Sequence, residues 1–224
     1  MTIKLGIPSK GRLMEKTFDW FATHGITLKQ TGAEREYSGA VEGIEGIELV
    51  MLSASEIPRE LAAGRIHLGV TGSDLVRDKL VSWDRKLSEL AQMGFGHADL
   101  IIAVPKTWVD VDTLDDLDAA AAAFRARHGF RLRIATKYHH LVHAYLIEHG
   151  VADYQLVDSQ GATAEAVADI TSTGDTLRAN HLKVLSCEPV HKSQATLFKS
   201  RTAIWSDEDR VIMAELKKRL ELDH

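Results

Sequence analysis

The strongest constraint on the fold is a recurring order: a short apolar run, a turn rich in glycine and hydroxyl residues, then a helix. Residues 3–7 are largely apolar, residues 8–11 break that run, and Met14, Phe18 and Phe21 follow at helical spacing. The same order recurs at residues 66–80. Strands that alternate with helices in this way indicate an α/β fold, and we expect mostly parallel sheets.

Applied along the chain, the pattern predicts strands at residues 3–7, 47–52, 66–70, 97–104, 133–136, 155–157, 166–170 and 194–199. Helices are expected between Gly11 and Gly25, at residues 56–63, 75–80, 110–128 and 141–148, and after an N-cap at Ser206. A glycine-rich hairpin is expected at residues 37–46. The sequence has no long linker, so two domains would be joined by short crossings near Pro105 and Lys183.

Composition excludes several classes of protein. A formal net charge of -5 over 224 residues argues against a protein that coats nucleic acid. The first residues lack the apolar stretch of a secretory signal, and no run approaches the length of a membrane span. With Cys187 as the single cysteine, an internal disulfide is impossible, and we expect a cytoplasmic protein.

The sharpest chemical signal is residues 169–178, where an apolar strand meets hydroxyl residues around a glycine and then a helix. Gly174 would let the backbone approach an anion, while Ser172, Thr173 and Thr176 would donate hydrogen bonds to it. Asp169 could accept from ribose hydroxyls. The pattern therefore predicts a phosphate cradle, although an ordinary helix-capping turn uses the same residue types.

A second signal is Pro8-Ser9-Lys10-Gly11-Arg12-Leu13, again a strand, a tight turn and a helix. Ligands of open α/β sheets bind at the carboxyl ends of the strands, and Lys10 with Arg12 could hold a polyphosphate there. The alternative is a pair of solvated surface cations.

Weaker signals remain. Arg35 is a weak signal that could equally be plain loop. The turn Thr71-Gly72-Ser73-Asp74 could present hydroxyls and amides to a nucleotide, or it could simply turn the chain. Asp74 could be a helix cap or a metal-facing carboxylate. His139, His140 and His143 form a cluster without a His-Glu-x-x-His pattern, so a solvated or packing role is favoured over a metal site.

Taken together, these motifs resemble the ATP phosphoribosyltransferases that begin histidine biosynthesis. The resemblance spans nearly the whole chain: the opening Pro8 to Leu13 motif, Ser55-Glu56-Ile57-Pro58, Leu68 to Leu75, Gly94 to Leu100, Arg133 to Tyr138, and Asp169 to Leu177 followed by Asn180. Any one could be chance, but their order and spacing are typical of the family.

The resemblance implies a two-domain α/β fold like that of periplasmic binding proteins (type II) with a central cleft. Residues 1–104 plus 184–224 would form the ATP side, and residues 105–183 the phosphoribosyl pyrophosphate side. It assigns Lys10, Arg12 and Arg35 to catalysis, together with Mg²⁺. It assigns phosphoribosyl pyrophosphate to Asp169, Thr171, Ser172, Thr173, Gly174, Asp175 and Thr176, and the nucleotide to Gly11, Thr71, Gly72, Ser73 and Asp74.

The length resembles that of the short form of the family. This resemblance implies that the chain forms a homodimer, and that it assembles with a regulatory subunit related to histidyl-tRNA synthetase into a hetero-octamer. The chain departs from the family pattern in two places. Only residues 164–168 separate Thr163 from Asp169, so the loop is either truncated or incomplete, and the role of Glu165 stays open. Ser53 stands where many relatives carry arginine, and we assign it no role.

Two other functions remain open on the sequence alone. A solute-binding module of the same two-lobe architecture would bind without catalysis, but such proteins are usually exported. A phosphoribosyltransferase acting on a free nucleobase or amine would normally carry paired acids before the phosphate loop, and here Ala168 precedes Asp169.

Overall fold

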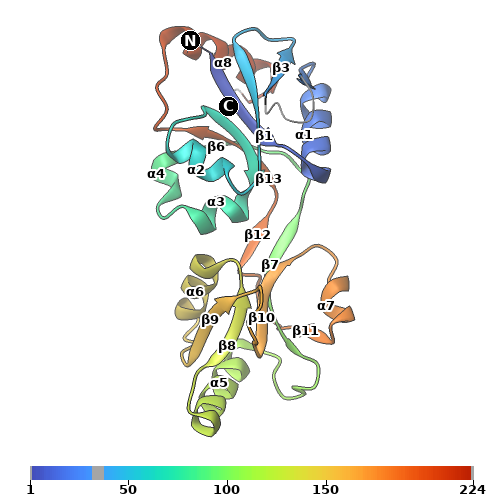
Figure 1. Ribbon diagram of the computed structural model, residues 1–224, viewed down its shortest axis with the longest axis vertical. Helices are drawn as coiled ribbons and strands as arrows, with labels where there is room; N and C mark the ends of the chain where they lie inside the picture. Colours follow the sequence, from blue (N-terminus) through green and yellow to red (C-terminus); the bar gives the residue numbers. More distant parts are fainter. Residues whose placement is uncertain (1, 32–37, 223–224) are drawn as a thin grey trace. The chain divides into compact units, whose positions relative to one another are not determined.

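The computed structural model describes residues 2–31 and 38–222, which form two compact units (Figure 1). Unit 1 consists of Met1–Gly96 and Gln194–His224, and unit 2 of His97–Ser193. We expected crossings near Pro105 and Lys183. The chain instead passes from unit 1 to unit 2 before Pro105, between Gly96 and His97, and returns after Lys183, between Ser193 and Gln194. The first crossing is early because strand β7 (Ala98–Pro105) pairs only with strands of unit 2 in the described chain.

Unit 1 is built on a mixed sheet with strand order β2-β3-β4-β1-β5-β13-β6. The strands are β1 (Ile3–Pro8), β2 (Thr27–Gln30), β3 (Ser38–Glu42), β4 (Ile47–Leu52), β5 (Leu68–Gly72), β6 (Leu87–Gln92) and β13 (Ala195–Ser200). Strand β1 runs parallel to β4 and β5, whereas β13 is antiparallel to β5 and β6. The carboxyl ends of β1, β4 and β5 therefore share one edge of the sheet.

Helices cover both faces of this sheet. They are α1 (Gly11–Thr23), α2 (Ile57–Ala62), α3 (Ser73–Lys79), α4 (Trp83–Lys86) and α8 (Asp207–Arg219). Leu197 and Phe198 are adjacent on β13 and so point to opposite faces. Leu197 packs in a cluster with residues of α1 and α8, and Phe198 in a cluster with residues of α2 and α3, so the two helix pairs lie on opposite faces.

Unit 2 contains a sheet of order β11-β7-β10-β8-β9, with β12 also paired to β7. Its further strands are β8 (Leu132–Thr136), β9 (Tyr154–Asp158), β10 (Ala166–Thr171), β11 (Leu182–Val184) and β12 (His191–Ser193), and its helices are α5 (Leu114–His128), α6 (His139–Glu148) and α7 (Asp175–Ala179). Strands β8, β9 and β10 are parallel, and β7 is antiparallel to its neighbours. The central position of β10 fixes where its following turn emerges.

The mixed pairing corrects one expectation. The two-unit α/β architecture is confirmed, but the prediction of mostly parallel sheets is wrong, because antiparallel pairs outnumber parallel ones among the described strands. The excess comes from hairpin-type neighbours such as β2 and β3, and from β7 and β13, each of which is antiparallel to every partner it has in the described chain.

Two helices begin with a full capping box. The predicted N-cap at Ser206 is confirmed: its side chain accepts the Asp209 backbone N–H, and the Asp209 carboxylate accepts the Ser206 N–H. Thr113 and Asp116 make the same exchange at the start of α5. This second box sets the helix start at Leu114, later than the expected residue 110, since the N-cap residue must leave helical geometry.

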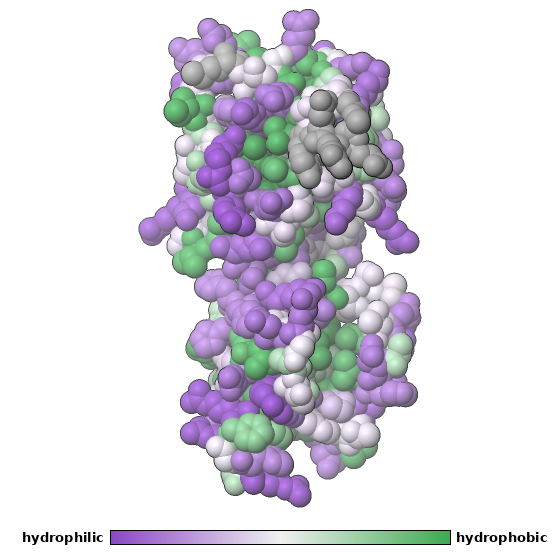
Figure 2. Space-filling model, in the orientation of Figure 1, coloured by the Kyte–Doolittle hydropathy of each residue, from purple (hydrophilic) through white to green (hydrophobic). Residues whose placement is uncertain are grey.

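Exposed apolar side chains are spread over several parts of the described chain. Large exposed apolar side chains such as Val109, Ile147 and Val211 lie on separate segments, and the face shown in Figure 2 has apolar residues interspersed with polar ones. Scattered exposure of this kind is normal for a globular surface. Within the described ranges, no helix combines the length and apolar character needed to cross a bilayer.

Candidate anion and nucleotide sites

The turn between β10 and α7 has the geometry expected of a phosphate loop. Strand β10 ends at Thr171, and Gly174 adopts φ 76°, a left-handed conformation that costs glycine little and other residues more. Helix α7 then begins at Asp175. The chain thus turns tightly at the end of a central strand, with hydroxyl side chains on either side of the glycine.

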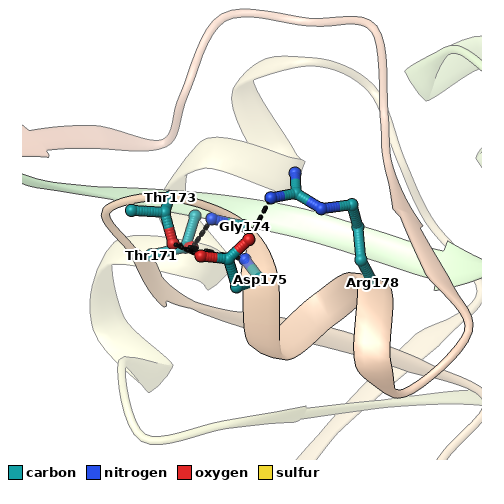
Figure 3. A network of polar contacts seen from close by, with 5 residues as sticks. All are labelled: Thr171, Thr173, Gly174, Asp175 and Arg178. Carbon is teal, nitrogen blue, oxygen red and sulfur yellow. Dashed lines mark hydrogen bonds and ion pairs between the residues drawn. The ribbon is translucent and has the colours of Figure 1, made fainter.

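A polar network holds this turn in shape (Figure 3). The Thr171 hydroxyl accepts the Gly174 N–H at 2.8 Å, and the Thr173 hydroxyl donates to the Asp175 carboxylate at 2.7 Å. The Arg178 guanidinium, one turn along α7, forms an ion pair with the same carboxylate. The Thr173 hydrogen bond and then the Arg178 charge lower the pKa of Asp175, so this carboxylate is anionic at neutral pH.

The turn borders a hollow of about 570 Å³ within unit 2. Its lining includes the side chains of Thr171, Ser172, Thr173 and Thr176 and two carboxylates, Asp169 and Asp175; no lysine or arginine is among the described residues that line it. Ser172 and Thr176 are exposed. Within the described chain no hydrogen bond involves their hydroxyls, so these groups are available to a ligand.

In unit 1, polar turns follow the three parallel strands β1, β4 and β5. After β1, Lys10 is extended (φ -160°, ψ 165°), Gly11 is left-handed (φ 74°), and α1 starts at once. Lys10 and Arg12 are both exposed, and neither forms an ion pair with any other described residue. Two exposed cations, neither of them paired within the described chain, therefore flank the turn at the carboxyl end of β1, the kind of position where open α/β sheets bind ligands.

The turn after β4 contains a hydrogen-bonded cluster to which the sequence assigned no role. The Ser53 hydroxyl and N–H both donate to the Glu56 carboxylate, at 2.6 and 3.1 Å, and the Ser55 hydroxyl lies 3.2 Å from that of Ser53. These hydrogen bonds lower the pKa of Glu56. The turn after β4 lies beside the turn after β1, because the Ser9 N–H donates to the Leu52 carbonyl. A signal existed, since a serine three residues before a glutamate is a capping pattern.

The turn after β5 is more buried than its composition suggested. Thr71 is inaccessible to solvent, and its hydroxyl donates to the Ala54 carbonyl at 2.7 Å. Ser73 and Asp74 are also buried, and the Ser73 N–H donates to the Gln194 carbonyl at 3.1 Å. Thr71 thus ties the β5 turn to the β4 turn, and Gly72 is the least buried residue of the four.

Arg35 and the histidine cluster are the remaining residues that the sequence singled out. Arg35 lies outside the described residues. The histidines line one hollow but have different partners: His139 pairs with Asp158 at 2.9 Å, whereas His143 contacts the Tyr154 hydroxyl at 2.7 Å. No cluster of three metal-ligating side chains occurs in residues 2–31 and 38–222. The packing role favoured for His143 agrees with its contact to Tyr154, a buried residue.

Comparison with known proteins places this geometry in context. A family model described as ATP phosphoribosyltransferase matches residues 53–222. An ATP phosphoribosyltransferase of Cereibacter sphaeroides is 73% identical over 92% of this chain and 91% of its own length. Another, from Mesorhizobium japonicum, is 50% identical over 90% of each chain.

A solved structure shares the fold. One chain of the ATP phosphoribosyl transferase (HisG:HisZ) complex from Thermotoga maritima superposes with a TM-score of 0.71, covering 99% of this chain and 98% of that one. The sequence identity is 21%, so this match bears on the architecture alone.

Proposed function

Because this chain belongs to the ATP phosphoribosyltransferase family, its reaction is known, and we propose how its residues bind the two substrates. The enzyme transfers the 5-phosphoribosyl group of phosphoribosyl pyrophosphate to N1 of ATP, giving phosphoribosyl-ATP and pyrophosphate in the first step of histidine biosynthesis. The observation that carries this function is the 73% identity to a curated family member over 92% of the chain. A solute-binding module and a nucleobase-specific transferase are thereby set aside.

In our proposal, the β10–α7 turn binds the 5′-phosphate of phosphoribosyl pyrophosphate. The support is local: Gly174 opens the backbone, and Ser172 and Thr176 carry hydroxyls with no acceptor in the described chain. Thr171 and Thr173 mainly hold the turn, since their hydroxyls already bond Gly174 and Asp175. Asp169, also in the lining of the hollow, is assigned to the ribose hydroxyls because a carboxylate accepts from both.

ATP and the departing pyrophosphate are assigned to unit 1. The exposed cations Lys10 and Arg12 would contact phosphate oxygens, with Gly11 giving close access to the backbone. Arg35 is assigned with them on the sequence motif alone. The Thr71 to Asp74 turn is assigned to the nucleotide, through the backbone near Gly72; the buried hydroxyl of Thr71 serves as a support.

The chemistry requires positioning more than proton transfer. The lone pair of adenine N1 forms the new bond to C1′ of the ribose, while the bond from C1′ to the pyrophosphate oxygen breaks and its electrons leave on that oxygen. The nucleophile needs no base and the leaving group is already an anion. Cations and oriented donors that match the developing charge should therefore supply most of the rate enhancement.

Mg²⁺ is part of the proposal, and the residues suit it. Magnesium keeps several waters and is usually held by one or two carboxylates plus substrate phosphates, so no dedicated protein cage is required. Asp169 is the carboxylate in the lining of the hollow that has no cationic partner in the described chain, and it would hold the ion. When bound, Mg²⁺ would neutralise charge on the pyrophosphate group.

A regulatory partner and a cytoplasmic location complete the proposal. The Thermotoga maritima relative is a HisG:HisZ complex, which supports a HisZ-like subunit, related to histidyl-tRNA synthetase, for this chain as well. We propose a homodimer of this chain within a hetero-octamer. The cytoplasm is proposed because a chain with one cysteine, Cys187, suits a reducing compartment.

The test is an assay of the purified chain with ATP, phosphoribosyl pyrophosphate and Mg²⁺, with and without a HisZ-like subunit. Phosphoribosyl-ATP should form, and its absorbance measures the rate of the reaction. Adding the partner should change that rate. Product formation that is independent of added Mg²⁺ after chelation would exclude the metal. If adding the partner changes neither the activity of this chain nor its size in solution, the complex is excluded.

A further inference from the structure

The β10–α7 hollow has the wrong local charge for the ligand assigned to it. Two of its lining residues, Asp169 and Asp175, are carboxylates, and no described lining residue is a lysine or arginine. Asp175 is the first residue of α7, directly after Gly174, where a phosphate would have to approach. An uncompensated carboxylate there would repel a phosphate dianion at close range.

Arg178 is the cation that the fold brings to this carboxylate. One guanidinium nitrogen pairs with Asp175, and another lies 3.3 Å from the point where a side chain at Gly174 would begin. Figure 3 shows the guanidinium reaching back from α7 over the glycine turn. Glycine at position 174 therefore does two things: it permits the left-handed turn and it leaves room for the guanidinium beside the loop.

The ion pair is poorly placed to stabilise the fold. The side chains of Arg178 and Asp175 are 61% and 73% exposed, and exposed pairs of this kind contribute little to stability. Its location beside the anion loop is the feature that distinguishes it. Arg210 and Asp207 form a comparable exposed pair at the same spacing in the first turn of α8, far in sequence from the loop.

We propose that Arg178 is a positioning residue for phosphoribosyl pyrophosphate: by offsetting the charge of Asp175, it makes the β10–α7 turn able to accept the sugar phosphate. The proposal rests on the assignment of the 5′-phosphate to this turn. It adds a specificity element that lies outside the Asp169 to Thr176 segment and acts through Asp175 rather than on the reacting atoms.

The test measures KM for phosphoribosyl pyrophosphate and kcat separately in the complete enzyme, with ribose 5-phosphate as a competitive probe of the same site. Arg178→Gln should raise KM for phosphoribosyl pyrophosphate and the inhibition constant of ribose 5-phosphate by about tenfold, because one screened charge interaction is of that size. The value of kcat should change little. Arg178→Lys, which keeps the charge, should recover part of the loss. The double variant Asp175→Asn with Arg178→Gln should recover most of it, because the repelling carboxylate is gone.

Two comparisons separate the possible failures. Arg210→Gln, the matched control, should leave KM unchanged. If Ser172→Ala with Thr176→Val leaves KM unchanged, the phosphate assignment itself is wrong. If that variant raises KM while Arg178→Gln does not, the assignment stands and the role of Arg178 is overturned. A double variant that binds as weakly as Arg178→Gln would overturn charge compensation, and circular dichroism confirms that each variant is folded.

Discussion

The Glu165 carboxylate contacts Arg133 through three hydrogen bonds: it accepts the backbone N–H at 2.8 Å, Nε at 3.2 Å and Nη2 at 2.5 Å. The side chains are 15% and 30% exposed, and the Glu165 N–H in turn donates to the Arg133 carbonyl. Glu165 precedes β10 and Arg133 lies on β8, so the pair locks two neighbouring strands together. The residue whose role the sequence left open is a structural support of the strand that carries the anion loop.

Replacing Glu165 by glutamine should destabilise the protein by about 1–3 kcal/mol, since the substitution removes the charge from a partly buried set of hydrogen bonds. Urea denaturation measures the change. Glu60 is the matched control, because its more exposed carboxylate accepts two hydrogen bonds from the Arg65 guanidinium at 2.7 Å and, within the described chain, none from a backbone N–H. Glu60→Gln should cost less than about 1 kcal/mol. Equal costs would show that the backbone contact and burial are unimportant.

The same pair predicts a pH dependence. Burial raises the pKa of Glu165, but the hydrogen bonds from Arg133 outweigh it and the pKa lies below its ordinary value. A lowered pKa in the folded state means that the stabilisation is complete above the unfolded pKa of about 4.3 and is lost as the pH falls through the lower folded value. The stability gap between the natural protein and Glu165→Gln should therefore be constant near neutral pH and shrink in acid. A gap that widens in acid would contradict this assignment.

The strands that the sequence failed to predict lie mostly at the margins of the sheets. In unit 1, β2 and β6 are the two edge strands; β2 buries only Leu28, and most of β6 is half-buried. An edge strand needs little apolar surface, so its sequence lacks the alternation that marks a strand. Central strands such as β1 and β5 are mostly buried and were predicted within two residues of their observed bounds.

The candidate sites show a similar division. Residue types at the end of a strand were enough to predict the turn at Gly174 and its hydroxyls, because turn chemistry is local. The contacts of Glu165 with Arg133, and of Thr71 with Ala54, join segments whose proximity depends on strand order. No periodicity in the sequence carries that information, and the burial of Thr71 was accordingly missed.

Variants of Thr71 should separate support from ligand binding. Thr71→Ser keeps the hydroxyl that donates to Ala54 and should retain both stability and KM for ATP within a small factor. Thr71→Val removes the donor to the partly buried Ala54 carbonyl and should lower the free energy of unfolding by about 1–3 kcal/mol. Thermal denaturation and steady-state kinetics measure the two effects. If Thr71→Val loses ATP affinity at unchanged stability, the hydroxyl is a ligand after all.

Arg12 provides the most direct test of the nucleotide assignment. Its side chain is exposed and unpaired within the described chain, so Arg12→Ala should leave stability nearly unchanged. The loss of one oriented cation from a site that depends on charge stabilisation should lower kcat by about a hundredfold or more. Lys16→Ala is the control, because Lys16 is an exposed cation on the same helix but outside the turn. An Arg12→Ala enzyme that is folded and retains its kcat would remove Arg12 from the mechanism and leave Lys10 as the cation of this turn.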